Sequence, residues 1–204
     1  MKREIFNCEQ GSDEWFSVRR GIVTASRFDD VMAKGKGGGE SVTRRKYMLT
    51  LIGERLTGET AESYANGHME RGKAMEAEAR DTYSLVTGLE VKPVGFVKFG
   101  DDIGASPDGL PADGGLEIKT KLPHLHLDCM LRGEVPSEHL KQIQGQMWVA
   151  DLEWSDFVSF WSGLPIFIKR VPRDSKMIAE IHSAVSIFVE EMLETMEEIK
   201  RIGG

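Results

Sequence analysis

The chain has 204 residues, of which 40% are hydrophobic and 29% are charged, and its formal net charge is −7. These proportions are typical of a globular protein, and the length predicts a single domain over residues 1–204. No apolar run reaches the ~18 residues that a membrane span needs, and the first residues lack the apolar core of a secretory signal. Cys8 and Cys129 are too few for a disulfide scaffold or a structural zinc site, so we expect a cytoplasmic protein.

Charge is unevenly distributed along the chain. Residues 17–46 contain eight basic and three acidic side chains, whereas the segment from Asp174 onward contains seven acidic residues. The acidic total argues against a protein that coats nucleic acid over its whole surface. The asymmetry instead suggests one face for an anionic partner, although solvated helix faces would give the same pattern.

The N-terminal part of the chain has a mainly helical pattern. Ser12 and Thr24 each precede a helix-like segment and are candidate N-cap residues. Residues 34–40 contain three consecutive glycines, so they predict a flexible loop, and the lack of a GK[ST] ending argues against a nucleotide-binding P-loop. Residues 43–57 and roughly 66–86 then predict two further helices.

The central part of the chain has strand-and-turn character, and helical patterns return toward the end. Short β-branched and aromatic segments lie between residues 91 and 120, and residues 108–115 resemble the connection between two antiparallel strands. The later elements are a helix, two strands and a long amphipathic helix, at residues 137–150, 156–161, 166–171 and about 175–201. These elements predict an α/β fold with a central mixed β-sheet flanked by helices.

Three residues of the central segment could form a hydrolytic site. Asp108 lies in a turn, and Glu117 and Lys119 are two apart on the following strand, so their side chains share one face. If the two strands pair, Asp108 lies beside Glu117, and two carboxylates together favour Mg²⁺ or Mn²⁺. A neighbouring lysine can then orient or activate water for phosphodiester hydrolysis. A simple turn followed by a solvent-facing strand would contain the same residue types.

Four segments resemble a known family of nucleases. They are QGSDEWFSVRRGIVTASRF, RGKAMEAEAR, GASPDGL with LEIK, and QIQGQMWV, and together they span roughly residues 9–150 in the family's order. The chain is identified by them as similar to the phage lambda exonuclease/YqaJ-type viral recombinase family, within the PD-(D/E)xK nucleases. The resemblance implies a restriction-endonuclease-like core over about residues 66–172.

The resemblance assigns the metal site and the catalytic residues. It implies that Asp108, Glu117 and the Ile118 carbonyl hold Mg²⁺, or Mn²⁺ in its place, while Lys119 positions or activates the attacking water. It adds Glu76 as a third carboxylate, which makes two ions per site the expectation. Glu78 lies two positions further along the helix and should point elsewhere.

The resemblance also assigns a pocket for the 5′-phosphate of a DNA end. The residues at the family's positions are Arg19, Thr24, Ser26, Ser106 and Gln144. An arginine and several hydroxyls suit phosphate oxygens, although Thr24 and Ser26 could equally be helix caps. Gln142 has the same choice between a DNA contact and a solvated position.

Two further features have weaker support. Met69 precedes the segment with Glu76, where the family places an apolar wedge that parts the duplex, and a core methionine would fit equally. His124 and His126 have no spacing to other ligands that would indicate zinc.

The implied function is a Mg²⁺-dependent 5′→3′ exonuclease on double-stranded DNA ends. Such an enzyme releases 5′-mononucleotides and leaves a 3′ overhang for recombination by strand annealing. The resemblance further implies a ring-shaped homotrimer, a single-strand annealing recombinase as partner, and a phage or prophage origin. Two alternatives stay open: a structure-specific endonuclease of the same superfamily, and a non-catalytic protein that binds DNA ends.

Overall fold

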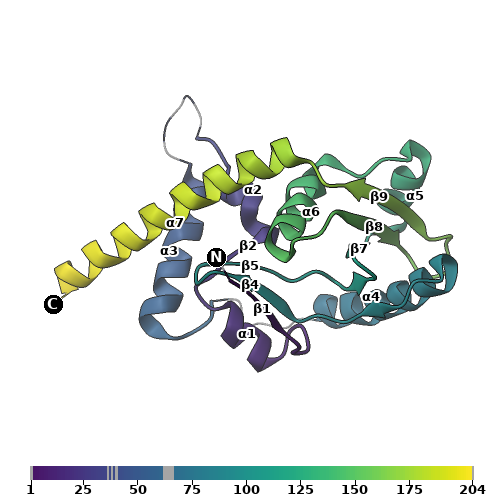
Figure 1. The fold of residues 1–204 in the computed structure, drawn as a ribbon, viewed down its shortest axis with the longest axis horizontal. Helices are drawn as coiled ribbons and strands as arrows, with labels where there is room; N and C mark the ends of the chain where they lie inside the picture. Colours follow the sequence, from purple (N-terminus) through teal and green to yellow (C-terminus); the bar gives the residue numbers. More distant parts are fainter. Residues whose placement is uncertain (1, 36, 38, 40, 62–66, 204) are drawn as a thin grey trace.

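The computed structural model describes residues 2–35, 37, 39, 41–61 and 67–203, without the side chains of residues 67–71 and 73. The chain forms mixed sheets flanked by helices, which confirms the predicted α/β class (Figure 1). The described strands form three hydrogen-bonded sheets, of four, two and three strands, in place of one central sheet. No described helix is long and apolar enough to cross a membrane.

The four-stranded sheet lies at the N-terminal end of the fold. Its order is β1 (Arg3–Phe6), β4 (Phe96–Phe99), β5 (Ile103–Ala105) and β2 (Val23–Thr24). β4 is antiparallel to β1 and β5, whereas β2 runs parallel to β5. Gly104 faces the ring of Phe96, which leaves no room for a Cβ atom, so the glycine permits this close packing.

The three-stranded sheet carries the predicted catalytic strand. β7 (Gly115–Thr120) pairs in parallel with β8 (Trp154–Phe160), and β9 (Phe167–Pro172) pairs antiparallel to β8. Six of the seven residues of β8 are buried, as expected for a strand covered on both faces. A two-stranded sheet of β3 (Val91–Lys92) and β6 (Leu110–Pro111) lies beside them.

The expected hairpin across residues 108–115 is only partly formed. β5 and β7 belong to different sheets, so they are not a hairpin pair. The turn after β5 reaches β7 through an antiparallel bridge between Gly109 and Leu116, in which the Leu116 amide donates to the Gly109 carbonyl at 3.0 Å. β7 instead forms a full ladder with the distant strand β8. Asp108 is held beside β7 by this bridge and by a hydrogen bond from its own amide to the Leu116 carbonyl at 3.0 Å.

The long helices agree with the sequence predictions. They are α3 (Val42–Thr57), α4 (Gly67–Thr87), α6 (Ser137–Ala150) and α7 (Ser175–Gly203). α1 (Asp13–Arg19) begins after Ser12, whose hydroxyl accepts a hydrogen bond from the Trp15 amide and therefore acts as the predicted N-cap.

Two local expectations differ from the structure. Thr24 precedes a 3₁₀ turn, η1 (Ala25–Arg27), and then α2 (Phe28–Val31), but its side chain forms no capping hydrogen bond. The Thr24 hydroxyl bonds instead to the Ser26 hydroxyl at 3.2 Å. A further helix, α5 (Pro123–Arg132), occupies a segment without a predicted structure, and proline stands at its first turn, where the missing N–H is tolerated.

The glycine-rich segment 34–40 lies partly outside the described residues, because 36, 38 and 40 are not described.

The described part of the core forms three apolar clusters, and α6 contributes side chains to two of them. The largest cluster joins α2, α3, α6 and α7, and its fully buried side chains include Phe28, Ile181 and Phe188. The second packs α4 against β7 and β8 through Tyr83 and Val158. β7 therefore lies between α4 and α6, which determines where its polar side chains point.

Candidate active site

Glu117 and Lys119 project from β7 on the same face, as their spacing predicts. The Glu117 side chain is 1% exposed, and the Lys119 ammonium lies 2.5 Å from its Oε1. An ammonium at this distance compensates the charge of a carboxylate that is otherwise costly to bury.

Asp108 joins this pair from the turn before β6. Its Oδ2 accepts a hydrogen bond from the Ile118 amide at 2.6 Å, which fixes the carboxylate beside the middle of β7. The structure therefore brings together Asp108, Glu117, Ile118 and Lys119, and all four line one pocket of about 250 Å³.

The electrostatics of this pocket are those of crowded carboxylates. Burial raises the pKa of Asp108 well above its usual range, and the charges of Glu117 and Glu76 raise it further. Burial alone would lower the pKa of Lys119, but Glu117 and Asp108 outweigh it, so the pKa of Lys119 lies above its usual value. These two carboxylates therefore favour the protonated form of Lys119, in which its ammonium pairs with Glu117.

Glu76 reaches the same pocket from α4. Its carboxylate pairs with Arg80, one helical turn away, at 2.7 Å, and burial raises its pKa. Arg80 also donates to the Asp108 carbonyl at 3.0 Å, so it links α4 to the catalytic turn. Glu78 points elsewhere, as predicted, and accepts from the Ser162 hydroxyl.

A divalent ion would find oxygen donors here. Among the described residues, no three His, Cys, Asp or Glu side chains are arranged to hold a metal ion. Glu76 is paired with Arg80. The donors that fit Mg²⁺ are the carboxylates of Asp108 and Glu117 with a backbone carbonyl of β7, all hard oxygens. The buried Gln146 Oε1, which accepts no hydrogen bond from the described residues, lies in the same pocket.

Two glutamines of α6 hold the Glu117 carboxylate from the other side. Gln142 donates to Oε1 and Gln146 donates to Oε2, each at 2.6 Å. Positions four apart lie on one face of a helix, so the pair could have been found from its spacing together with a buried acid. The sequence motif Q-x-Q-x-Q does not by itself show which of its glutamines face the site.

Gln144 does not lie in this pocket. It is 3% exposed, its amide donates to the Pro172 carbonyl, and its Oε1 accepts from the Asp174 amide, both at 2.9 Å. Two positions along a helix turn the side chain to the opposite face, so Gln144 fastens the start of α7 while its neighbours face the carboxylates.

The other residues predicted to bind phosphate do gather here. Arg19, Thr24, Ser26 and Ser106 line the same pocket as the carboxylates. Trp15 organises two of them, because its indole N–H donates to the Ser106 hydroxyl at 3.1 Å and the Arg19 guanidinium lies 3.8 Å from its ring centroid. The sequence contains a signal for this contact, since Trp15 and Arg19 are four apart on α1.

Two other residues singled out in the sequence are Met69 and His126, and the described His126 is not among those that line the pocket. The Met69 side chain, the suggested wedge, is outside the described residues. His126 is buried, and its two ring nitrogens bond to the Ser159 hydroxyl and the Pro165 carbonyl.

Comparison with known proteins identifies relatives of this arrangement. The YqaJ-like viral recombinase domain matches residues 14–153. LHK-Exo, an alkaline exonuclease from Laribacter hongkongensis, is 38% identical over 94% of this chain and 98% of its own, with a TM-score of 0.84. LHK-Exo in complex with dAMP matches equally well.

A more distant structure shares the fold. The phage related exonuclease from Haemophilus somnus 129PT is 18% identical over 87% of this chain and 96% of its own, with a TM-score of 0.65. No curated protein matches the sequence. With a domain match over most of its length and a relative at 38% identity, the chain belongs to the YqaJ-like viral recombinase family.

Proposed function

We propose that the protein is a Mg²⁺-dependent 5′→3′ exonuclease that degrades one strand from double-stranded DNA ends. The observation that carries the proposal is that one pocket contains both Asp108, Glu117 and Lys119 and the phosphate-binding candidates Arg19 and Ser26. A strand end anchored by its terminal phosphate would thus place a phosphodiester bond near the carboxylates.

Asp108, Glu117 and the Ile118 carbonyl would hold Mg²⁺, with Mn²⁺ as an alternative, and Glu76 would join them for a second ion after leaving Arg80. Bound there, the ion supplies charge neutralisation and activation of water. All of these donors are oxygen atoms, which are the ligands that Mg²⁺ prefers.

The residues of the chain would contribute orientation and charge. Gln142, Gln146 and Lys119 fix both oxygens of Glu117, so this carboxylate needs no reorganisation when substrate binds. Lys119, protonated by its surroundings, would donate to the water or to a phosphate oxygen as negative charge develops.

The position of the candidate phosphate-binding residues supports the proposed 5′→3′ polarity. Arg19, Thr24, Ser26 and Ser106 would bind the 5′-phosphate, with Arg19 held over Trp15. A bond cleaved next to that nucleotide would release a 5′-mononucleotide. The dAMP bound to LHK-Exo is a molecule of this class, which supports the proposal.

The assembly and partners are proposed from the family. They are a homotrimeric ring around DNA, a single-strand annealing recombinase that takes up the 3′ overhang, and a setting in the cytoplasm of a bacterial host with phage-type recombination. A YqaJ-like viral recombinase domain agrees with a DNA substrate.

Replacing Asp108 tests the chemistry. Asp108→Ala should leave a folded protein that still binds duplex ends but releases nucleotides at least about a hundredfold more slowly, because a principal oxygen ligand is lost. Nucleotide release and end binding are measured on the same preparation, with Asp113→Ala, in the exposed turn before β7, as the matched control. Release at the wild-type rate by Asp108→Ala would refute the site.

A further inference from the structure

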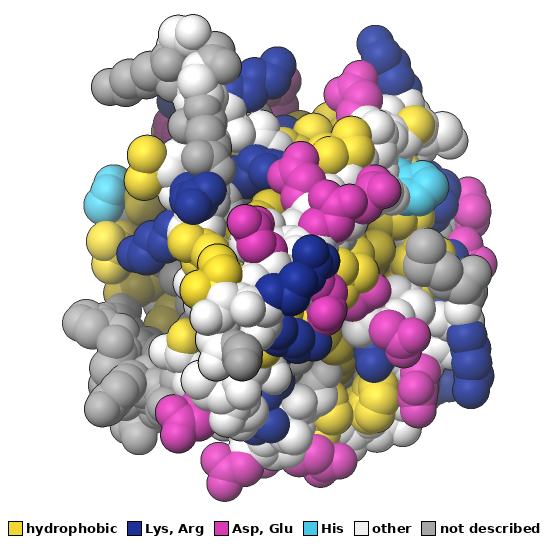
Figure 2. Space-filling view, turned by 90° about the vertical axis from the view of Figure 1, so that its left-hand side faces the viewer, with side chains coloured by type: hydrophobic (Ala, Val, Ile, Leu, Met, Phe, Trp, Pro, Cys, Tyr) yellow, Lys and Arg dark blue, Asp and Glu magenta, His cyan; other side chains and the backbone are white. Residues whose placement is uncertain are grey.

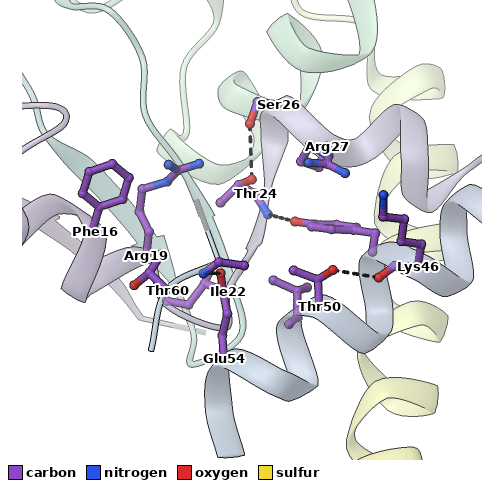
Figure 3. Close-up of a pocket in the computed structure, with 13 residues that line it drawn as sticks. Phe16, Arg19, Ile22, Thr24, Ser26, Arg27, Lys46, Thr50, Glu54 and Thr60 are labelled. Carbon is purple, nitrogen blue, oxygen red and sulfur yellow. Dashed lines mark hydrogen bonds between the residues drawn. The ribbon is translucent and has the colours of Figure 1, made fainter. Parts of the chain in front are cut away.

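A second cavity adjoins the catalytic pocket on the far side of the phosphate-binding residues. It measures about 340 Å³ and shares Arg19, Thr24 and Ser26 with the catalytic pocket. Because the two hollows share these three residues, the place proposed for the 5′-phosphate opens in two directions. One side faces the carboxylates. The other faces this cavity, which Figure 3 shows.

Positive charge lines the second cavity. Figure 3 shows Arg19 on one side of the Thr24–Ser26 pair, with Arg27 and Lys46 on the other side. Arg27 is held in place by an ion pair with Asp30 and lies 4.6 Å from the Tyr47 ring centroid. An arginine fixed in this way can bind an anion with little loss of side-chain entropy.

Lys46 extends into the cavity from α3 and forms no ion pair with the described residues. An ammonium group on a solvated stem is suited to a phosphate that arrives from solution. The Thr50 hydroxyl, which also lines the cavity, lies one turn further along α3 and is bonded to the Lys46 carbonyl at 2.9 Å.

Glu54, the acidic residue that lines the cavity, forms no ion pair with Arg27 or Lys46. Both oxygens of Glu54 accept backbone hydrogen bonds, from the Gly21 amide at 2.8 Å and from the Ala61 amide at 2.9 Å. Glu54 is 7% exposed. Its two hydrogen bonds connect separate segments of the cavity wall.

The cavity is also joined rigidly to the first phosphate site. The Tyr47 hydroxyl, from α3, accepts a hydrogen bond from the Thr24 amide at 3.1 Å. Arg27 lies over the same tyrosine ring, so one buried side chain positions residues of both hollows. Their separation is thus fixed by the fold, as a ligand with two linked phosphates requires.

We propose that Arg27 and Lys46 form a second phosphate subsite, which binds a phosphate attached on the 5′ side of the terminal nucleotide's own 5′-phosphate. The inference rests on the proposed function, because that function places the first phosphate at Arg19. Two sources supply this chemistry: the β-phosphate of a 5′-polyphosphate, and the phosphate of one further nucleotide on a 5′ overhang. In either case the enzyme accepts an end that is longer than a flush 5′-monophosphate.

Titration calorimetry without divalent metal tests the subsite independently of hydrolysis. The probes are dAMP, dADP and the 5′-phosphorylated dinucleotide pdApdA. The wild-type protein should bind dADP about tenfold more tightly than dAMP, since a charge-assisted contact to phosphate contributes about this factor. Lys46→Ala should reduce the preference below about threefold, and Lys46→Arg should preserve it.

Arg45→Ala is the matched control, because it removes one positive charge from the adjacent position of α3 but does not line the cavity. This variant should keep the wild-type preference. A Lys46 effect on dADP alone assigns the subsite to a polyphosphate end, and an additional effect on pdApdA assigns it to the next nucleotide.

Two failures are distinguishable. If Arg19→Ala weakens dAMP binding but Lys46→Ala changes neither the dADP preference nor pdApdA binding, the second subsite is refuted and the first stands. If Arg19→Ala leaves dAMP binding unchanged, the 5′-phosphate pocket of the proposed function is itself wrong, and the subsite defined next to it is wrong with it.

Discussion

The Glu117 carboxylate is held by three side chains at once. Lys119, Gln142 and Gln146 contact its two oxygens at 2.5–2.6 Å. A carboxylate without these donors would be expensive to bury, and with them its orientation is fixed before any substrate arrives. The three donors therefore serve both stability and preorganisation.

Lys119 supplies the positive charge among these three donors. Lys119→Gln should reduce hydrolysis by about 10²–10³-fold, because a neutral amide supplies a hydrogen bond but no positive charge. Binding of duplex ends should change much less. Single-turnover hydrolysis and end binding measure the two effects, and Lys121→Gln, two positions on, is the control. Equal losses for both variants would mean that Lys119 contributes only general positive charge.

His139 makes stability depend on pH through its burial. Burial, aided by the charges of Lys121 and Lys119, lowers the pKa of His139 to about 4, and its ring stacks on Phe157. An unfolded chain takes up a proton near pH 6.5, whereas the folded chain resists it, so stability falls as the pH decreases from about 6.5 toward 4.

The expected loss is on the order of 2 kcal/mol of unfolding free energy between pH 7.5 and 5. His139→Gln should remove that part of the dependence, while His124→Gln, at an exposed position, should retain it. Urea unfolding at the two pH values measures the difference. The same loss in His139→Gln and the wild type would exclude His139 as its source.

The two faces of helix α6 have different roles, because glutamines two positions apart point in opposite directions. Gln142 and Gln146 face the carboxylates, and Gln144, on the opposite face, bonds to the Pro172 carbonyl and the Asp174 amide. The helix thus joins the catalytic strand to the junction between β9 and α7. A change on one face should affect chemistry, and a change on the other should affect stability.

Gln144→Ala is therefore expected to destabilise the protein by about 1–3 kcal/mol, because it leaves two backbone groups without their partner. The preference for phosphorylated over hydroxyl 5′ ends should stay at the wild-type value. Denaturant unfolding and the ratio of degradation rates on the two ends measure these effects. A wild-type stability combined with a lost end preference would place Gln144 in the phosphate pocket after all.

The elements with strong local signals could be predicted from the sequence, and those set by distant partners could not. The apolar period of residues 43–57 is sufficient to define α3, and the two-residue spacing of Glu117 and Lys119 fixes their common face. The hairpin expectation failed because β7 takes its ladder from β8, about forty residues away, and local turn chemistry contains no information on that pairing.

In the candidate site, too, local signals predicted some residues, and the packing of distant elements determined the others. Residue type and spacing indicate Asp108, Glu117 and Lys119, whereas the choice among three alternating glutamines depends on the rotation of α6 against the sheet. Trp15 is a similar case, because its role depends on Ser106, which is far away in sequence.

At the scale of the whole molecule, the two charged segments are partly paired with each other. Arg44 of the basic segment forms an ion pair with Glu191 of α7 at 2.6 Å. Figure 2 shows the face at this end of the molecule, where lysine and arginine side chains lie among carboxylates and form no uniform basic patch. On this face, the charge asymmetry of the sequence does not produce a separate basic surface.

Positively charged side chains gather in the second cavity more than they do on this face. Arg19, Arg27 and Lys46 line one cavity, and the carboxylates lie in the pocket next to it. A strand end can be attracted and oriented by a few cations inside a largely acidic protein, because low-dielectric walls concentrate their field. The net charge of −7 is thus compatible with a DNA substrate.

The central claim, 5′→3′ hydrolysis from a phosphorylated end, is tested most directly by one digestion. The substrate is a linear duplex with a 5′-phosphate on one strand only and a different dye at the 3′ end of each strand. With Mg²⁺, the phosphorylated strand should shorten progressively from its 5′ end and keep its dye on the remaining fragment, while the complementary strand stays intact, and EDTA should stop the reaction. Early release of a 3′ dye on a mononucleotide, or equal digestion of both strands, would contradict the account.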